Sequence, residues 1–140
     1  MRISIVGTGY VGLVTALCFC ELGYQVVCID KDLDKVERIK NCELPFFARD
    51  LQKLFDAYID TSFSIVSDLE TGISKSDIVF VTVGTPYINE SIDLSFVKDV
   101  MREIGLIIKK SNNYHTIVVK STVVPGTTND ILKPILEQSS

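Results

Sequence analysis

The sequence predicts a doubly wound α/β fold, in which a parallel sheet is covered by helices on both faces. Short apolar runs rich in β-branched residues recur along the chain, and such runs are typical of strands buried on both faces. Longer segments with helical spacing separate them, and the two kinds of segment alternate strictly. This alternation implies right-handed crossovers between parallel strands, so a ligand is expected at the carboxyl ends of the strands.

Five strands are expected, of which the third is the least apolar. They cover residues 3–6, 26–29, 63–66, 78–83 and 117–119. The expected helices cover residues 11–22, 33–39, 51–59, 68–75, 96–108 and 128–136. In the doubly wound arrangement the strands take the order 3-2-1-4-5 across the sheet, with starts near residues 2, 25, 63, 77 and 115.

Length and composition fit a single domain that spans residues 1–140. With 46% hydrophobic residues, a chain of 140 residues can bury a sizeable core. The net charge of -4 provides no broad positive field, so neither nucleic acid nor an anionic membrane is an expected partner. No apolar run approaches the roughly 20 residues that span a bilayer, and no signal-peptide core follows Arg2. A soluble, cytoplasmic protein is therefore expected.

The four cysteines are interpreted as ordinary reduced thiols. Cys18 and Cys20 fall in an apolar helical segment, and neither they nor Cys28 and Cys42 form a CxxC pair. His115, the only histidine, has no ligand-spaced neighbour, so no metal site is expected. A catalytic thiol is the less favoured alternative, because free cysteine is commonly a small buried hydrophobe.

A glycine-rich loop follows the first strand. Residues 7–12 have the sequence Gly-Thr-Gly-Tyr-Val-Gly, which fits GxGxxG between a strand and a helix. Gly7 allows the tight turn, Gly9 lets the backbone approach a pyrophosphate, and Gly12 lets the helix pack closely on the strand. The start of the helix offers free N–H groups and the positive end of its dipole to phosphates. In this context the pattern predicts dinucleotide binding.

An acidic residue stands where the glycine pattern predicts one. Asp30 ends the second strand, about 20 positions after the first glycine. A carboxylate there accepts hydrogen bonds from the adenosine ribose and repels a 2′-phosphate, which favours NAD over NADP. Lys31 and Lys35 weaken this argument slightly, since a nearby cation accommodates a phosphate. The alternative role of Asp30 is to cap the next helix, for which Asp32 is at least as good a candidate.

Two further loops follow strands and should lie at the same edge of the sheet. One is Gly-Thr-Pro at 84–86, and the other is Lys-Ser-Thr-Val-Val-Pro-Gly-Thr at 120–127. Thr85 and Thr122 can supply hydroxyl groups to the nicotinamide half of a cofactor, and the glycine allows close backbone approach. In an equally consistent alternative, the prolines only end the strands, and one threonine of the pair 127–128 caps the final helix.

Together these motifs resemble the amino-terminal domain of the UDP-glucose/GDP-mannose dehydrogenase family. The resemblance rests on the loop at 7–13, Asp30 with Lys35, Val-Gly-Thr-Pro at 83–86 followed by Asp-Leu-Ser at 93–95, and the loop at 120–127. It covers nearly the whole chain and is more specific than the glycine loop alone. It implies a Rossmann fold, NAD as cofactor, and two-step oxidation of a nucleotide sugar at C6 through a thiohemiacetal and a thioester on a cysteine. UDP-glucose is the implied sugar, with GDP-mannose as the alternative.

The resemblance also implies roles for individual residues. It assigns the pyrophosphate to Gly7, Gly9, Tyr10, Val11 and Gly12, and the adenosine ribose to Asp30 and Lys35. It assigns the nicotinamide half to Gly84, Thr85 and Thr122, and it gives Thr122 a catalytic role in holding a water. Members of the family form dimers through a long helix after this domain, so a homo-oligomer is implied for the full-length protein.

The chain departs from the family in two respects. Relatives usually carry Glu-Pro-Gly-Leu where residues 48–51 are Ala-Arg-Asp-Leu, and only the leucine matches. The nucleophilic cysteine, lysine and asparagine of the family lie in its central and UDP-binding domains, which residues 1–140 do not include. The 140 residues are therefore expected to bind NAD but to oxidise no sugar alone, and the nucleotide sugar is an expected partner only through the missing domains.

Two other functions fit part of the pattern. A stand-alone NAD-sensing regulatory domain shares the fold, the length and the glycine loop, but has no need of the loops at 84–86 and 120–127. An unrelated Rossmann dehydrogenase shares the first loop and not the last. The sequence therefore favours the nucleotide-sugar dehydrogenase over both.

Overall fold

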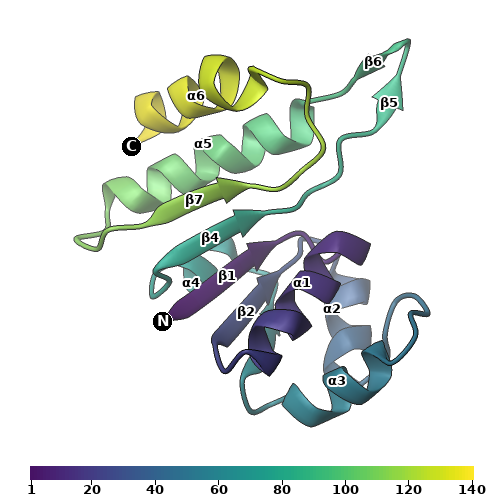
Figure 1. Ribbon diagram of the computed structural model, residues 1–140. Helices are drawn as coiled ribbons and strands as arrows, with labels where there is room; N and C mark the ends of the chain where they lie inside the picture. The colour runs from purple at the N-terminus through teal and green to yellow at the C-terminus, as the bar shows by residue number, and fades with distance from the viewer.

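The computed structural model describes residues 1–140 and contains a parallel sheet with helices on both faces (Figure 1). The sheet has the order β3-β2-β1-β4-β7, which confirms the predicted 3-2-1-4-5 because β7 is its fifth strand along the chain. Each strand starts within one residue of its expected position. The strands are β1 (Arg2–Val6), β2 (Gln25–Ile29), β3 (Phe63–Val66), β4 (Ile78–Val81) and β7 (Thr116–Val119).

The helices divide between the two faces of the sheet. They are α1 (Tyr10–Glu21), α2 (Leu33–Lys40), α3 (Leu51–Tyr58), α4 (Leu69–Ile73), α5 (Ser95–Lys109), the π-helical turn η1 (Thr128–Leu132) and α6 (Lys133–Ser139). The first three helices pack against one face, and α4, α5 and α6 pack against the other. None of the helices has the length and apolar character needed to cross a membrane.

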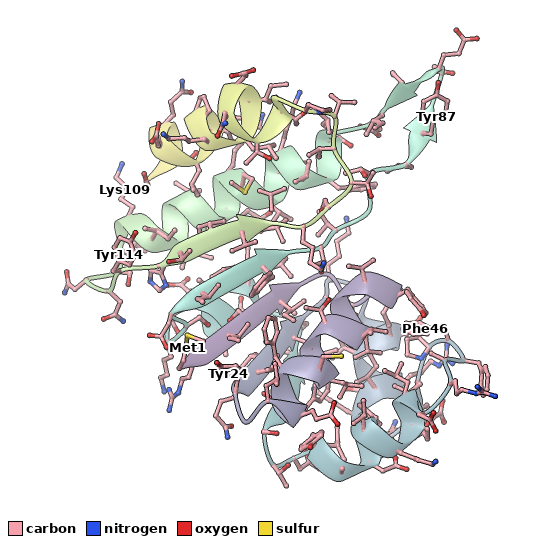
Figure 2. All side chains as sticks on the ribbon, in the orientation of Figure 1. Met1, Tyr24, Phe46, Tyr87, Lys109 and Tyr114 are labelled. Carbon is pink, nitrogen blue, oxygen red and sulfur yellow. The ribbon has the colours of Figure 1, made fainter.

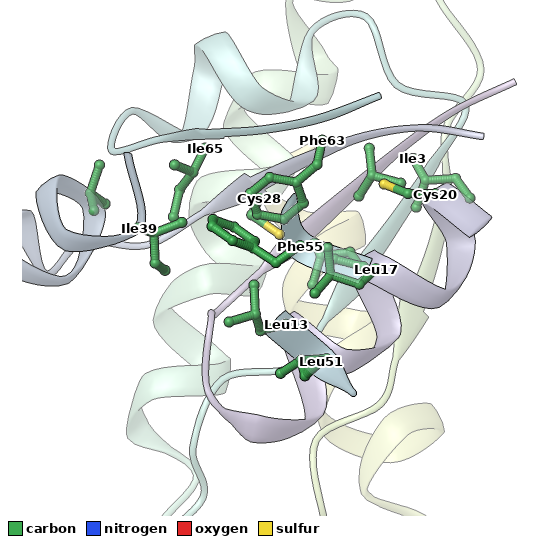
Figure 3. Packing of buried hydrophobic residues seen from close by; sticks show 14 residues of the cluster. Ile3, Leu13, Leu17, Cys20, Cys28, Ile39, Leu51, Phe55, Phe63 and Ile65 are labelled. Atoms are coloured by element: carbon green, nitrogen blue, oxygen red, sulfur yellow. The ribbon is translucent and has the colours of Figure 1, made fainter. Parts of the chain in front are cut away.

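The hydrophobic core has two parts, because alternate side chains of a strand point to opposite faces of the sheet. On β1, Ile3 and Ile5 belong to one part and Val6 to the other. Figure 3 shows the first part, where the rings of Phe55 on α3 and Phe63 on β3 meet edge to face, with centroids 5.5 Å apart. Full burial of a phenylalanine contributes about 1.5–3 kcal/mol to folding stability, so this pair stabilises the packing of α3 on the edge strand β3.

A hairpin that the sequence did not reveal projects beyond the carboxyl ends of the strands, between β4 and α5 along the chain (Figure 1). It consists of β5 (Tyr87–Ile88) and β6 (Ser91–Ile92). Its turn residues Asn89 and Glu90 both have positive φ, 50° and 62°, as a type I′ turn requires. The usual sequence of that turn is Asn-Gly, and Asn-Glu carries no such signal. The fourth strand accordingly ends at Val81, before the predicted position 83.

The last predicted helix, 128–136, also differs from the expectation. It begins as η1 and continues as α6 to Ser139. Thr127 stands at the N-cap with helical backbone angles and makes no side-chain capping bond, while Thr128 lies inside the turn. The alternative in which Thr127 or Thr128 caps the final helix is therefore wrong, because a capping residue needs an extended backbone to reach the following N–H groups.

The loop that departs from the family pattern keeps a glycine-like backbone. Asp50 has φ 59°, in the left-handed region, at the position where the family resemblance implies a glycine. Aspartate tolerates this region better than most residues, because its short side chain forms local hydrogen bonds. Leu51, the one residue that matches the pattern, is buried at the start of α3. The substitution at Asp50 thus leaves the entry into α3 intact.

Candidate functional site

The predicted loops gather at the carboxyl edge of the sheet, around the ends of β1, β2 and β4 (Figure 1). The amide of Gly7 donates to the carbonyl of Ile29 at 2.8 Å, which joins the glycine loop to the end of β2. The hydroxyl of Thr82, just after β4, donates to the carbonyl of Gly7 at 2.7 Å. The glycine loop is therefore fixed between its two neighbouring strands.

Each glycine of the loop has a different surrounding. Gly7 has φ +101°, a backbone conformation that a residue with a side chain would adopt only with strain. A Cβ on Gly12 would lie 1.9 Å from the carbonyl oxygen of Gly7, so α1 packs closely on the loop. A Cβ on Gly9 would meet nothing within 4 Å. The loop thus has open space beside Gly9, where a ligand can reach the backbone.

The start of α1 is free of side-chain caps. Gly9 is its N-cap, and no acidic residue lies in the first turn. Tyr10 and Val11 turn their side chains to solvent, with 62% and 47% exposure. The ring of Tyr10 packs against Phe46, with centroids 5.1 Å apart, and Figure 2 shows Phe46 beside the start of α1. The backbone N–H groups of this turn are therefore what it offers to an anion.

Asp30 is a buried carboxylate surrounded by donors. Its Oδ2 atom accepts from the amide and the hydroxyl of Thr8, at 2.9 and 2.6 Å, and from the ammonium of Lys35 at 2.8 Å. Its Oδ1 atom accepts from the amide of Asp32 at 3.1 Å. Burial alone would raise the pKa of Asp30, but the bonds from Lys35 and Thr8 outweigh it and hold that pKa below its usual value. The carboxylate is therefore ionised at neutral pH.

The structure separates the two roles that the sequence left open for Asp30. Asp32 is the N-cap of α2, and its side chain accepts from the amide of Lys35 at 3.1 Å. Asp30 makes no capping bond and faces the glycine loop. Sequence reasoning missed Thr8, which lies between the first two glycines. A small hydroxyl residue next to a predicted buried carboxylate is the signal that would have found it.

The two threonine loops meet, as expected from their places after β4 and β7. The hydroxyl of Thr85 donates to the carbonyl of Thr122 at 2.6 Å. The hydroxyl of Ser121 donates to the carbonyl of Val83 at 2.7 Å. Thr122 is exposed and Thr85 is half-buried, and a Cβ on Gly84 would meet nothing within 4 Å. These loops form an open surface beside the glycine loop, on which Thr122 is exposed.

None of the four cysteines belongs to these loops. All four cysteines are free, as predicted, and Cys20 and Cys28 are buried in the core of Figure 3. Burial raises the pKa of both thiols, which keeps them protonated and unreactive at neutral pH. No three metal-ligating side chains gather anywhere in the chain.

A parallel sheet, a glycine loop that opens α1, and an ionised carboxylate at the end of β2 define a dinucleotide-binding Rossmann domain. Residues 1–140 match the UDP-glucose/GDP-mannose dehydrogenase family, NAD binding domain, over their whole length. The chain belongs to this family, and NAD is its cofactor. The open space at Gly9 and the ionised Asp30 fit that cofactor.

Individual relatives bear two different names. GDP-mannose 6-dehydrogenase of Pseudomonas aeruginosa is 38% identical over 142 residues, which are 100% of this chain and 33% of the relative. UDP-glucose 6-dehydrogenase of Rhizobium meliloti is 36% identical over 98% of this chain and 31% of the relative. A ternary complex of GDP-mannose dehydrogenase from Pseudomonas aeruginosa superposes with a TM-score of 0.95 and 37% identity, over 100% of this chain and 33% of that one. The chain spans about a third of the length of the curated relatives it matches.

Proposed function

We propose that residues 1–140 hold NAD for a nucleotide-sugar dehydrogenase that oxidises UDP-glucose to UDP-glucuronate in two steps. The observation that carries the proposal is the Asp30 carboxylate, ionised and directed at the glycine loop from the end of β2. It supplies the acceptor that the ribose hydroxyls of a dinucleotide need. Its charge repels a 2′-phosphate and so favours NAD over NADP.

Within this proposal each loop binds one part of the cofactor. The backbone of Gly7, Gly9, Tyr10, Val11 and Gly12 receives the pyrophosphate, since the N–H groups at the start of α1 are uncapped. Asp30 and Lys35 bind the adenosine ribose. Gly84, Thr85 and Thr122 line the nicotinamide half, where bound NAD supplies the hydride acceptor. The exposed hydroxyl of Thr122 holds the water that attacks in the second step.

The remaining groups of the reaction belong to parts of the family that these 140 residues do not contain. We place the nucleophilic cysteine and the sugar pocket in the central and UDP-binding domains of a longer, homo-oligomeric, cytoplasmic protein. Hydride transfer requires the substrate beside the nicotinamide and a nucleophile beside the reacting carbon. The isolated 140 residues therefore bind NAD and oxidise no sugar.

GDP-mannose is the second candidate substrate. Relatives of both names match nearly the whole chain, with identities of 38% and 36%. That small difference in identity does not distinguish the two substrates, because these residues are proposed to bind the cofactor and not the sugar. UDP-glucose remains the first choice, on the motifs from which the family was inferred.

Calorimetry and turnover assays test this proposal together. NAD is titrated into the 140-residue protein, and then UDP-glucose or GDP-mannose is added with NAD while the absorbance of reduced cofactor is followed. We expect NAD binding and no turnover by these residues, and turnover of UDP-glucose by the complete gene product. Turnover of GDP-mannose alone would change the substrate. NAD binding without turnover of either sugar by the complete product would favour an NAD sensor.

A further inference from the structure

Thr8 has two hydrogen-bond donors, its hydroxyl and its backbone amide, and both donate to the same atom of Asp30. Its hydroxyl lies 2.6 Å and its amide nitrogen 2.9 Å from Oδ2 of Asp30. Thr8 is 1% exposed, and its hydroxyl donates to no other group. Removal of this hydroxyl therefore affects Asp30 before anything else in the fold.

The contact decides which oxygen of Asp30 is available to a ligand. With Lys35 included, Oδ2 accepts three hydrogen bonds, which is more than its two lone pairs favour. Oδ1 accepts only the 3.1 Å bond from the amide of Asp32. A further donor therefore finds its acceptor at Oδ1, and the carboxylate cannot turn without losing the bonds to Oδ2.

We infer that Thr8 is a positioning residue for cofactor recognition, which fixes Oδ2 of Asp30 so that Oδ1 receives a ribose hydroxyl. This inference rests on the proposed role of Asp30 in binding NAD. Thr8 does not touch the ribose in this assignment. It acts by restricting the rotation of the carboxylate, so that less conformational entropy is lost when the cofactor binds.

The protonation of Asp30 gives the inference a second readout. The titratable groups that face the carboxylate are the Lys35 ammonium from α2 and the Cys28 thiol from β2, while the glycine loop contributes only the uncharged Thr8. Burial keeps the thiol neutral. Hydrogen bonds from Lys35, from Thr8 and from the backbone amide of Asp32 thus keep the carboxylate charged. Loss of the Thr8 hydroxyl moves the pKa of Asp30 upward.

A mutant cycle measured by calorimetry tests the inference. NAD is titrated into the wild-type protein, Thr8→Val, Thr8→Ser, Asp30→Ala and the double variant Thr8→Val/Asp30→Ala, from neutral pH into the acid range. We expect Thr8→Val to weaken NAD binding about tenfold at neutral pH, and Thr8→Ser to stay within about twofold of wild type. In the Asp30→Ala background, Thr8→Val should have no further effect.

The pH series separates positioning from a structural defect. Ionised Asp30 binds NAD, so affinity is lost as the pH falls through the pKa of Asp30, and this loss should begin at higher pH in Thr8→Val. Ser4→Ala is the matched control, because Ser4 is buried and its hydroxyl donates to the carbonyl of Gly72 at 2.6 Å, away from Asp30. We expect this variant to unfold at lower temperature with an unchanged pH profile.

Three outcomes would overturn the inference. They are an unchanged affinity in Thr8→Val, an acid limb that does not move, and a loss of affinity that persists in the Asp30→Ala background. If Thr8→Val does not fold, Thr8→Ala takes its place in the same cycle, since it keeps the backbone bond. If Asp30→Ala itself binds NAD like wild type, the proposed role of Asp30 fails first, and the two failures are distinguishable.

Discussion

The two halves of the proposed cofactor site differ in how completely they are formed before a cofactor binds. In the adenosine half, Thr8 and Asp30 are 1% and 9% exposed, and the carboxylate already accepts bonds from the amides or side chains of three residues. In the nicotinamide half, Thr122 is exposed, Thr85 is half-buried, and a single 2.6 Å bond joins them. One half is ordered before the cofactor arrives, and the other is an open surface.

The difference follows from the connections after the strands. β1 and β2 are neighbours in the sheet, and short turns lead from each directly into a helix, so their loops lie in contact. After β4 the chain instead leaves the sheet for the β5–β6 hairpin before it returns to α5. The adenosine half is therefore fixed by local packing, whereas the nicotinamide half lacks neighbours that would enclose it. We expect affinity for NAD to come mainly from the first half.

The largest expected effect comes from Gly9→Val. The added side chain fills the open space that the pyrophosphate needs, so NAD binding should fall by on the order of a hundredfold. Its backbone angles, φ -71° and ψ -171°, suit any residue, and thermal unfolding should stay unchanged. Gly12→Ala is the contrast, because a Cβ there lies 1.9 Å from the carbonyl of Gly7 and should cost about 3 kcal/mol of stability. A Gly9→Val protein that binds NAD normally would contradict the pyrophosphate assignment.

Asp30→Ala should have the next largest effect. Loss of the acceptor should weaken NAD binding by about tenfold to a hundredfold and lower the ratio of NAD to NADP affinity, as measured by paired titrations. Asp32→Ala is the matched control, because Asp32 caps α2 and its loss should cost about 1 kcal/mol of stability without changing that ratio. An unchanged ratio in Asp30→Ala would show that another residue selects the cofactor.

Much of the ordered half was predictable from sequence, and the reason is its regular spacing. Alternation of strands and helices gave the sheet order, and the distance from the glycine loop gave Asp30. Thr8 escaped prediction because its importance arises from a tertiary contact with Asp30 across 22 positions of the chain. The left-handed Asp50 escaped for a related reason, since the surrounding fold imposes that backbone and aspartate only tolerates it.

The open half was less predictable. The sequence placed Thr85 and Thr122 at one edge, because the carboxyl ends of parallel strands meet there. It did not reveal the hairpin or the π-helical turn that flank them. Two-residue strands carry too few alternating positions for a pattern, and a single π-helical turn is too short to be told from an α-helix by its apolar spacing.

Thr85→Val tests how little the open half contributes. Solvent can replace the hydrogen bond of this half-buried hydroxyl, so its loss should cost about 0.5 kcal/mol and NAD affinity should fall by no more than about threefold. Thr61→Val is the control, since the Thr61 hydroxyl likewise donates to a backbone carbonyl, that of Tyr58 at 2.9 Å, far from the site. If calorimetry gave Thr85→Val a loss as large as that of Asp30→Ala, the two halves would contribute equally and the comparison would fail.

Lys31→Met should have the smallest effect, and it tests how strongly the adenosine half binds NADP. Lys35 is held by Asp30 at 2.8 Å, but the ammonium of Lys31 lies over the ring of Phe96, 4.6 Å from its centroid. An exposed contact of this kind is worth only about 0.5–1 kcal/mol, so Lys31 is free to turn toward a 2′-phosphate beside Asp30. Lys31→Met should therefore weaken NADP binding about twofold and leave NAD binding unchanged.

Salt and a matched charge change decide whether this small effect belongs to the 2′-phosphate. The loss should shrink at high salt, because an exposed cation is screened. Lys110→Met removes the same charge at the far end of α5 and should change neither affinity. Equal losses for NAD and NADP in Lys31→Met would assign Lys31 to the pyrophosphate that both cofactors share. A loss confined to NADP would instead mean that Lys31 attracts the 2′-phosphate while Asp30 repels it. The carboxylate held by Thr8 would then be the dominant determinant of cofactor choice.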